Sequence, residues 1–184
     1  MGAVALVQRR TAGGEPMSIS REVLAKYIKP EDVFIETGTK WGGTVIKAIE
    51  LGAQLAFSCE LDEKQYDMAS KHLADALPGS EWALFNERST SFLHRFVAEV
   101  VLGGCVVYLD AHTEDKSPVI QELSVIDKWR TKPRVILIDD LRLMESHWKI
   151  PLTAVRESLT GMGYAIDFED GVEKADIMVG QRLT

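Results

Sequence analysis

The sequence contains little cysteine and no long apolar run. Its two cysteines, Cys59 and Cys105, lack a metal-binding Cys-x-x-Cys spacing, and each lies in a short apolar segment. We therefore expect buried, reduced thiols, which fit a cytoplasmic protein. No segment approaches the roughly 20 apolar residues that a membrane span needs. The first residues are briefly apolar and then basic, which reverses the order found in a signal peptide.

An excess of basic residues is also absent. Lysine and arginine total 21 against 28 acidic residues, so the formal net charge is −7. Phosphate backbones and anionic membranes are bound by clustered basic side chains. The charge balance therefore argues against a nucleic-acid or membrane partner.

The length of 184 residues suits one domain. Residues 1–17 include the segment Thr11-Ala12-Gly13-Gly14 and show no periodic pattern, so we expect a flexible leader there. Residues 18–184 are expected to form the single folded domain.

From Ser20 onward, helical and strand patterns alternate, and a β-hairpin closes the chain. Five strand-then-helix units followed by a hairpin predict an α/β fold. We expect a doubly wound, Rossmann-like, mostly parallel seven-stranded sheet with helices on both faces and a C-terminal antiparallel hairpin. A polar loop is expected after Asp140. The expected strands are 32–36, 55–60, 82–85, 105–109, 135–138, 164–168 and 175–179.

A glycine-containing turn follows the first expected strand. It reads Glu36-Thr37-Gly38-Thr39, then Lys40-Trp41, then Gly42-Gly43-Thr44. Gly38 permits a tight turn, and the later glycines let a ligand approach the next helix closely. The spacing differs from the Gly-x-Gly-x-x-Gly of dinucleotide sites, which disfavours an NAD-dependent oxidoreductase. A turn that binds no ligand is the alternative.

Two further segments suggest a nucleoside site. Glu60 ends the second strand, 24 residues after Glu36, where an acid can accept hydrogen bonds from ribose hydroxyls. A solvated acid at a helix start is the alternative reading. Asn86 to Ser89 follow the third strand and offer polar groups to an adenine edge.

Carboxylates follow the fourth and fifth strands. Asp110 is followed by His112, and Asp139 precedes Asp140. Because these strands should be neighbours, the three carboxylates should converge and repel one another unless a cation compensates. Oxygen-rich groups of this kind suit Mg²⁺, Ca²⁺ or Mn²⁺, whereas the alternative is that some of them cap helices or turns. His112 is a candidate general base or an ordinary loop histidine.

These motifs together resemble class I S-adenosylmethionine-dependent methyltransferases. The Gly38 turn and Glu60 are similar to that family's cofactor loop and ribose-binding acid. The segments ending in Asp110-Ala111-His112 and Asp139-Asp140, with Arg142, resemble the metal-dependent O-methyltransferase branch, which includes catechol and macrocin O-methyltransferases. The loop departs from the commoner family pattern at Thr39, Lys40 and Trp41.

The resemblance implies S-adenosylmethionine as cofactor and Mg²⁺ as a metal aid to O-methylation of a small hydroxylated acceptor. It implies catalytic roles for Asp110 and His112, and metal ligation by Asp110, Asp139 and Asp140. The cofactor residues that it implies are Glu36, Thr37, Gly38, Thr39, Gly42, Thr44, Glu60, Leu61, Ser89 and Asp110.

Two other functions remain open at this point. One is a metal-independent methyltransferase whose acids orient the acceptor. The other is a non-catalytic domain that binds S-adenosylmethionine and serves as a partner subunit or sensor. A homodimer is also an expectation, because small domains without a lid often complete their pockets with a second chain.

Overall fold

Seven strands form one sheet in the order β3-β2-β1-β4-β5-β7-β6. The computed structural model describes residues 19–97 and 104–183, and the predicted leader at residues 1–17 lies outside them. The strands are β1 Val33–Thr37, β2 Leu55–Glu60, β3 Trp82–Asn86, β4 Cys105–Leu109, β5 Val135–Ile138, β6 Tyr164–Glu169 and β7 Ile177–Arg182. The pairs among β1 to β5 are parallel, and β7 pairs antiparallel with both β5 and β6. The predicted fold class is confirmed.

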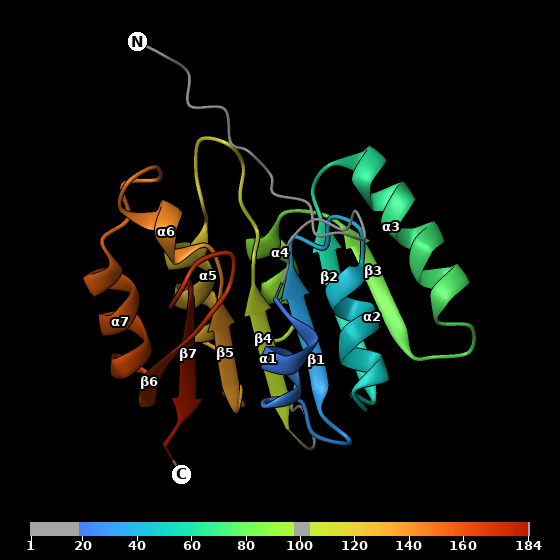
Figure 1. The fold of residues 1–184 in the computed structure, drawn as a ribbon, viewed down its shortest axis with the longest axis horizontal. Helices are drawn as coiled ribbons and strands as arrows, with labels where there is room; N and C mark the ends of the chain where they lie inside the picture. The colour runs from blue at the N-terminus through green and yellow to red at the C-terminus, as the bar shows by residue number, and fades with distance from the viewer. Residues whose placement is uncertain (1–18, 98–103, 184) are drawn as a thin grey trace.

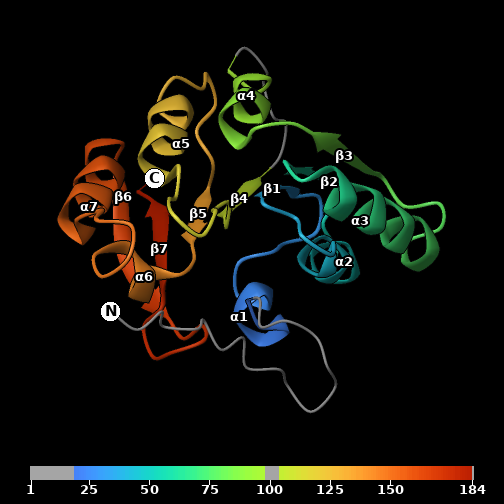
Figure 2. The same cartoon turned by 90° about the horizontal axis from the view of Figure 1, so that it is seen from above.

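Helices cover both faces of this sheet, as Figure 2 shows from above. They are α1 Arg21–Ala25, α2 Gly43–Glu50, α3 Glu63–Ala76, α4 Ser89–His94, α5 Val119–Ile126, α6 Leu141–Met144 and α7 Leu152–Gly161. Apolar side chains of α1, α2 and α3 pack on one face, and those of α4, α5 and α7 pack on the other. No helix among the described residues is long and apolar enough to cross a membrane.

The central strands β4 and β5 are buried along their whole length, as their continuous apolar sequences predict. Each fully buried Val, Leu or Ile side chain contributes about 1.5–3 kcal/mol through removal of apolar surface from water. The two apolar layers therefore hold β4 and β5 in the middle of the sheet, where Figure 1 shows them side by side.

The strand register places the predicted site residues along one edge of the sheet. Thr37 of β1 pairs with Leu109 of β4, and Leu109 pairs with Ile138 of β5. The next residue of each strand, Gly38, Asp110 and Asp139, therefore emerges at the same level. Strand order reverses between β1 and β4, and ligands of doubly wound sheets bind at such a point.

The segment after Asp140 differs from the prediction. Its expected polar loop begins instead with the short helix α6. Leu141 and Met144 lie three residues apart and are both buried, so this turn has an apolar side. Asp176, just before β7, accepts hydrogen bonds from the backbone N–H of Leu141 through its carbonyl (3.0 Å) and of Arg142 through its carboxylate (2.9 Å). These contacts satisfy the free N–H groups of the first helical turn.

Gly38 has a backbone φ of +81°, and a side chain there would collide with the loop after β4. A Cβ atom on Gly38 would lie 2.8 Å from both the Ala111 Cα atom and the Asp110 carbonyl oxygen. The glycine therefore allows the loops that follow β1 and β4 to touch.

Replacement of Gly38 by alanine should lower the free energy of unfolding by about 2–4 kcal/mol, because backbone strain and overpacking add. Gly79→Ala is the matched control, since Gly79 has a φ of +78° but no atom within 4 Å of the added Cβ. This control should lose only about 1 kcal/mol. Urea unfolding of both variants measures the difference, and equal losses would contradict the close contact of the two loops.

Candidate functional site

The loop after β1 is held in place by a hydrogen bond to the buried side chain of Glu36. This residue is 1% exposed, and its Oε2 atom accepts hydrogen bonds from the hydroxyls of Thr39 and Ser58, each at 2.7 Å. The Thr44 hydroxyl also interacts with the Glu36 carboxyl and lowers its pKa. Glu36 thus ties the loop and the start of α2 to β2. No pattern in the sequence pointed to this role of Ser58.

Burial raises the pKa of Glu36 to about 7, although the hydroxyls of Ser58, Thr39 and Thr44 oppose the rise. A carboxyl with a higher pKa in the folded chain than in the unfolded chain binds a proton on folding. It stabilises the fold at low pH, and that contribution is lost as the pH rises from about 4.5 towards 7.

Glu60 lies at the end of β2 and faces the same loop. Its Oε2 atom accepts the backbone N–H of Lys40 at 2.9 Å. Its Oε1 atom accepts the N–H groups of Leu61 at 2.8 Å and Asp62 at 3.0 Å. A carboxylate offers about four lone pairs, so Oε2 keeps an acceptor site for a ligand hydroxyl.

Asp110 and Asp139 lie side by side beyond β4 and β5. Loss of solvation and repulsion from Asp139, Asp140 and Glu36 raise the pKa of Asp110 well above its usual value. Burial raises the pKa of Asp139 to about 6. Asp139 accepts hydrogen bonds from the Tyr108 hydroxyl and, at 2.8 Å, from the backbone N–H of Asp140. Tyr108 therefore fixes the orientation of Asp139.

Asp140 differs from Asp110 and Asp139 because its pKa is lowered whereas theirs are raised, so Asp140 is the acid that stays ionised most readily. Burial alone would raise the pKa of Asp140, but the hydrogen bond from His112 and the Arg142 guanidinium outweigh it and hold the pKa below its usual value. The His112 Nε2 atom lies 3.2 Å from Asp140 Oδ2, and Arg142 Nη1 lies 2.6 Å from Asp140 Oδ1. Arg142 also pairs with the buried carboxylate of Asp176.

Two groups of side chains are compact enough to hold a metal ion among the described residues. Ligand atoms of Asp110, His112 and Asp140 all lie within 4.8 Å of one another. Asp139, Asp140 and Asp176 form a second such group, which Arg142 already contacts. The predicted set Asp110, Asp139 and Asp140 is therefore divided between the two groups. His112 joins Asp110 and Asp140 in the first, and Asp176 joins Asp139 and Asp140 in the second.

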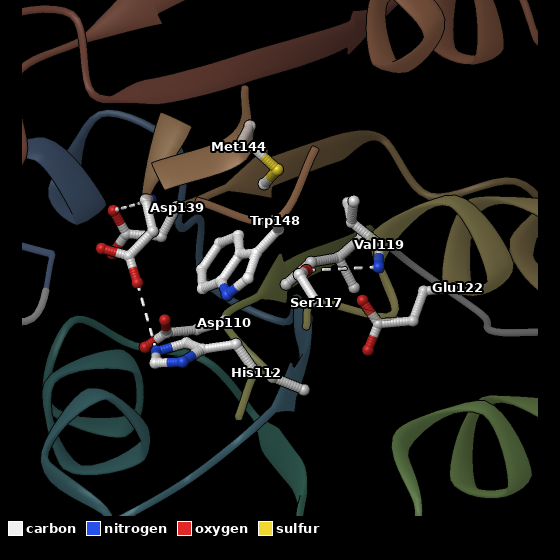
Figure 3. Close-up of a pocket in the computed structure, with 11 residues that line it drawn as sticks. Asp110, His112, Ser117, Val119, Glu122, Asp139, Met144 and Trp148 are labelled. Atoms are coloured by element: carbon white, nitrogen blue, oxygen red, sulfur yellow. Dashed lines mark hydrogen bonds and ion pairs between the residues drawn. The ribbon is translucent and has the colours of Figure 1, made fainter. Parts of the chain in front are cut away.

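Asp110, His112, Asp139 and Asp140 line a pocket together with residues that the sequence did not single out (Figure 3). Among them are Glu122 of α5 and Trp148, which follows α6. An available signal was Glu122 itself, since it lies three residues after Val119 on the apolar side of a predicted helix. No pattern in the sequence pointed to Trp148, whose ring centre lies 5.0 Å from that of His112.

The remaining predicted cofactor residues differ in how far they are buried and in the element on which they lie. Thr37 is buried, and its carbonyl accepts the backbone N–H of Asp110 at 3.1 Å. Gly42 precedes α2 with a φ of +78° and packs against Leu73. Ser89 is buried at the start of α4, whereas Leu61 is 52% exposed beside Glu60. The side-chain amide of Asn86 donates to the Glu60 carbonyl at 2.9 Å, which fixes the strand ends around Glu60.

Glu36→Gln should reduce the loss of stability at high pH, because glutamine fills the same space without a charge. Between pH 5 and pH 8 the variant should gain up to about 3 kcal/mol relative to the unchanged protein. Urea unfolding at both pH values measures this difference. Parallel pH profiles of the two proteins would show that Glu36 does not take up a proton on folding.

Neither a family model nor a curated protein matches this sequence. Solved structures do match the fold. A magnesium protoporphyrin IX methyltransferase from Synechocystis PCC 6803 with bound S-adenosylmethionine has a TM-score of 0.60 and 13% identity, over 89% of this chain and 78% of that one. An rRNA methylase from Streptococcus thermophilus has a TM-score of 0.59 and 13% identity, over 89% and 94%.

An O-methyltransferase family protein from Burkholderia thailandensis has a TM-score of 0.58 and 15% identity, over 89% of this chain and 55% of that one. Identities at this level show a common fold and nothing finer. The chain therefore has the Rossmann-like fold of class I methyltransferases.

Proposed function

We propose that this chain is an S-adenosylmethionine-dependent methyltransferase that methylates a hydroxyl of a small acceptor with the help of Mg²⁺. The observation that carries the proposal is the strand register. It brings Gly38, Glu60 and Asp110 to one edge of the sheet at the point where strand order reverses. The Synechocystis methyltransferase that shares this fold has S-adenosylmethionine bound, which supports the choice of cofactor.

In this proposal the loop after β1 and Glu60 bind the cofactor. The left-handed backbone at Gly38 keeps the loop free of side-chain atoms next to Asp110 and Ala111. The Oε2 atom of Glu60 accepts a ribose hydroxyl, and the amides of Lys40, Leu61 and Asp62 hold the carboxylate in place. Leu61, which is exposed, offers an apolar surface to the adenine.

The donor set at the other end of the site fits a divalent cation. Asp110 and Asp140 supply carboxylate oxygens within 4.8 Å of each other, and each Asp139 oxygen keeps a lone pair beyond the hydrogen bond that it accepts. Burial and repulsion from Asp139 and Asp140 both raise the pKa of Asp110, and a bound cation would relieve the repulsion. When bound, Mg²⁺ lowers the pKa of an acceptor hydroxyl, and S-adenosylmethionine supplies the methyl group.

His112 is the proposed base. It is exposed, lines the pocket and lies on the loop that follows β4. Its Nε2 atom is 3.2 Å from Asp140, and this carboxylate stabilises the imidazolium that forms when His112 takes the acceptor's proton. The ring of Trp148 packs against the imidazole and limits its movement. Proximity and alignment of acceptor and methyl group account for the rest of the acceleration.

A metal-independent methyltransferase is the second candidate, and one contact favours it. Arg142 already pairs with Asp140 and Asp176, so part of the carboxylate charge is neutralised by the chain itself. Titration with a metal separates the two candidates.

Calorimetric titration with S-adenosylmethionine and S-adenosylhomocysteine tests the cofactor site, and both should bind in the micromolar range. Glu60→Ala should weaken binding about 10- to 100-fold, because a hydrogen bond to a charged group is lost. Glu63→Ala, an exposed acid at the start of α3, is the control and should bind normally. Absence of binding by the unchanged protein would refute the methyltransferase proposal.

Titration with Mn²⁺, followed by water-proton relaxation, tests the metal site without an acceptor. Asp140→Asn should weaken Mn²⁺ binding at least tenfold, since it removes a charged ligand. Asparagine tolerates the left-handed backbone of Asp140, which has a φ of +61°, so the loop should keep its shape. The control, Asp115→Asn, changes an exposed acid of the neighbouring loop. Equal Mn²⁺ affinity in all three proteins would favour the metal-independent candidate.

A further inference from the structure

A second pocket lies at the edge of the sheet opposite the candidate site. It is found where β4 and β5 begin and β7 ends, which is the lower edge of the sheet in Figure 1. Strand β4 joins the two places, since Cys105 at its start lines this pocket and Leu109 at its end lines the other. The volume of the second pocket is about 380 Å³, within the range of roughly 300–1,000 Å³ that small-molecule sites occupy. The pocket is therefore large enough for a small ligand.

Three basic side chains line this pocket, although acidic residues outnumber basic ones in the whole chain. They are Lys132, Arg134 and Arg182. The backbone N–H of Arg182 donates to the Arg134 carbonyl at 3.0 Å, and the Arg182 Nη1 atom donates to the Lys132 carbonyl at 3.5 Å. These contacts bring the three residues together around one space, where their like charges repel one another.

Arg134 is fixed in place by Asp32, which is 2% exposed. The Arg134 Nη2 atom donates to the Asp32 carboxylate at 2.5 Å and to the Tyr27 carbonyl at 2.6 Å. Gly104 makes room for this pair, because a Cβ atom there would lie 1.7 Å from Asp32 Oδ1. The Nη1 atom of Arg134 donates to no described residue, and the side chain is 31% exposed. Arg134 therefore offers the pocket a donor whose orientation is already set.

The acids near the pocket do not balance its cations. Asp32 pairs with Arg134, and the Asp127 carboxylate lies 3.7 Å from the Lys132 Nζ atom. Lys132 Nζ also donates to backbone carbonyls just after α5. Arg182 has no acidic partner among the residues that the structure describes. One positive charge in this pocket is therefore left without a counter-charge.

The pocket also has an apolar side. Leu183 is 67% exposed and lines the pocket together with Cys105. Burial raises the pKa of the Cys105 thiol to about 12, so this side chain stays neutral and behaves as a small apolar group. A ligand that covers Leu183 would remove apolar surface from water, which is favourable.

From this geometry we infer that the pocket binds a small organic anion. A carboxylate or phosphate group of the ligand contacts Arg134 and Arg182, and an apolar part covers Leu183. Arginine forms paired hydrogen bonds with either kind of oxyanion. One uncompensated charge suits a small anion, whereas a nucleic acid is bound by many basic side chains. The inference does not depend on the proposed function, because the two pockets lie at opposite edges of the sheet.

The test is a titration of ¹⁵N-labelled protein with benzoate and with phenyl phosphate, in the absence of S-adenosylmethionine. The backbone amide signals of Thr131 and Leu183 should shift in a saturable way, and those of Ala111 and His112 at the other pocket should stay in place. Phenol has the same ring without a charge at pH 7 and should produce no saturable shift. The relative affinities for benzoate and phenyl phosphate identify the oxyanion that the pocket prefers.

Two substitutions at exposed positions then test the binding groups. Arg182→Gln should weaken binding of the preferred anion about tenfold, because a hydrogen bond between charged groups is lost. Leu183→Ser should weaken it about fivefold, because less apolar surface is covered. Arg130→Gln is the control: it removes an exposed positive charge near Lys132 but outside the pocket lining, and it should bind normally. The dispersion of the amide signals shows whether each variant is folded.

Three results would overturn the inference. These are no saturable shift of the Thr131 and Leu183 signals with either anion, equal shifts with phenol, or unchanged affinity in folded Arg182→Gln. Absence of S-adenosylmethionine binding with normal anion binding would instead refute the methyltransferase proposal and leave the anion site intact.

Discussion

Carboxylates that have lost much of their solvation gather at the carboxyl edge of β1, β4 and β5, and the surrounding structure is arranged to tolerate them. Burial raises the pKa of Glu36, Glu122, Asp110 and Asp139. An isolated ionised carboxylate in an apolar interior is costly, so each needs a donor, a cation or a proton. Hydroxyls donate hydrogen bonds to Glu36, and the Tyr108 hydroxyl donates one to Asp139. Arg142 and His112 form ion pairs with Asp140. Asp139 and Asp140 line the pocket together with Asp110, and both keep these partners there.

This uneven compensation separates supporting acids from acids that can bind a ligand. Glu36 shapes the loop after β1 through Thr39 and Ser58, and it is buried too deeply to meet a ligand directly. Glu60 is held by backbone amides but retains acceptor capacity. Glu122 is buried, and the hydroxyls of Ser89 and Thr37 lower the pKa that burial raises.

The sequence was sufficient to predict the fold and the edge of the sheet at which the candidate site lies, because both follow from strand patterns. Continuous apolar segments identified β4 and β5, and parallel register then brought Gly38, Asp110 and Asp139 together. It was not sufficient for contacts that join distant segments. Asp176 accepts a hydrogen bond from the first turn of α6, the Trp148 ring contacts His112, and Ser58 donates a hydrogen bond to Glu36. None of these contacts produces a periodic pattern in the sequence. Glu122 was readable as an acid on an apolar helix side, yet only the structure shows that it lines the same pocket as Asp110 and His112.

The central claim is that the carboxyl edge of β1, β2 and β4 binds a methyl donor. A crystal structure of the protein soaked with S-adenosylhomocysteine tests it most directly. The account predicts that a ribose hydroxyl contacts the Glu60 carboxylate and that the cofactor's sulfur lies beside Gly38 and Asp110. Density for S-adenosylhomocysteine at another place on the sheet, or a crystal that takes up none at saturating concentration, would contradict it.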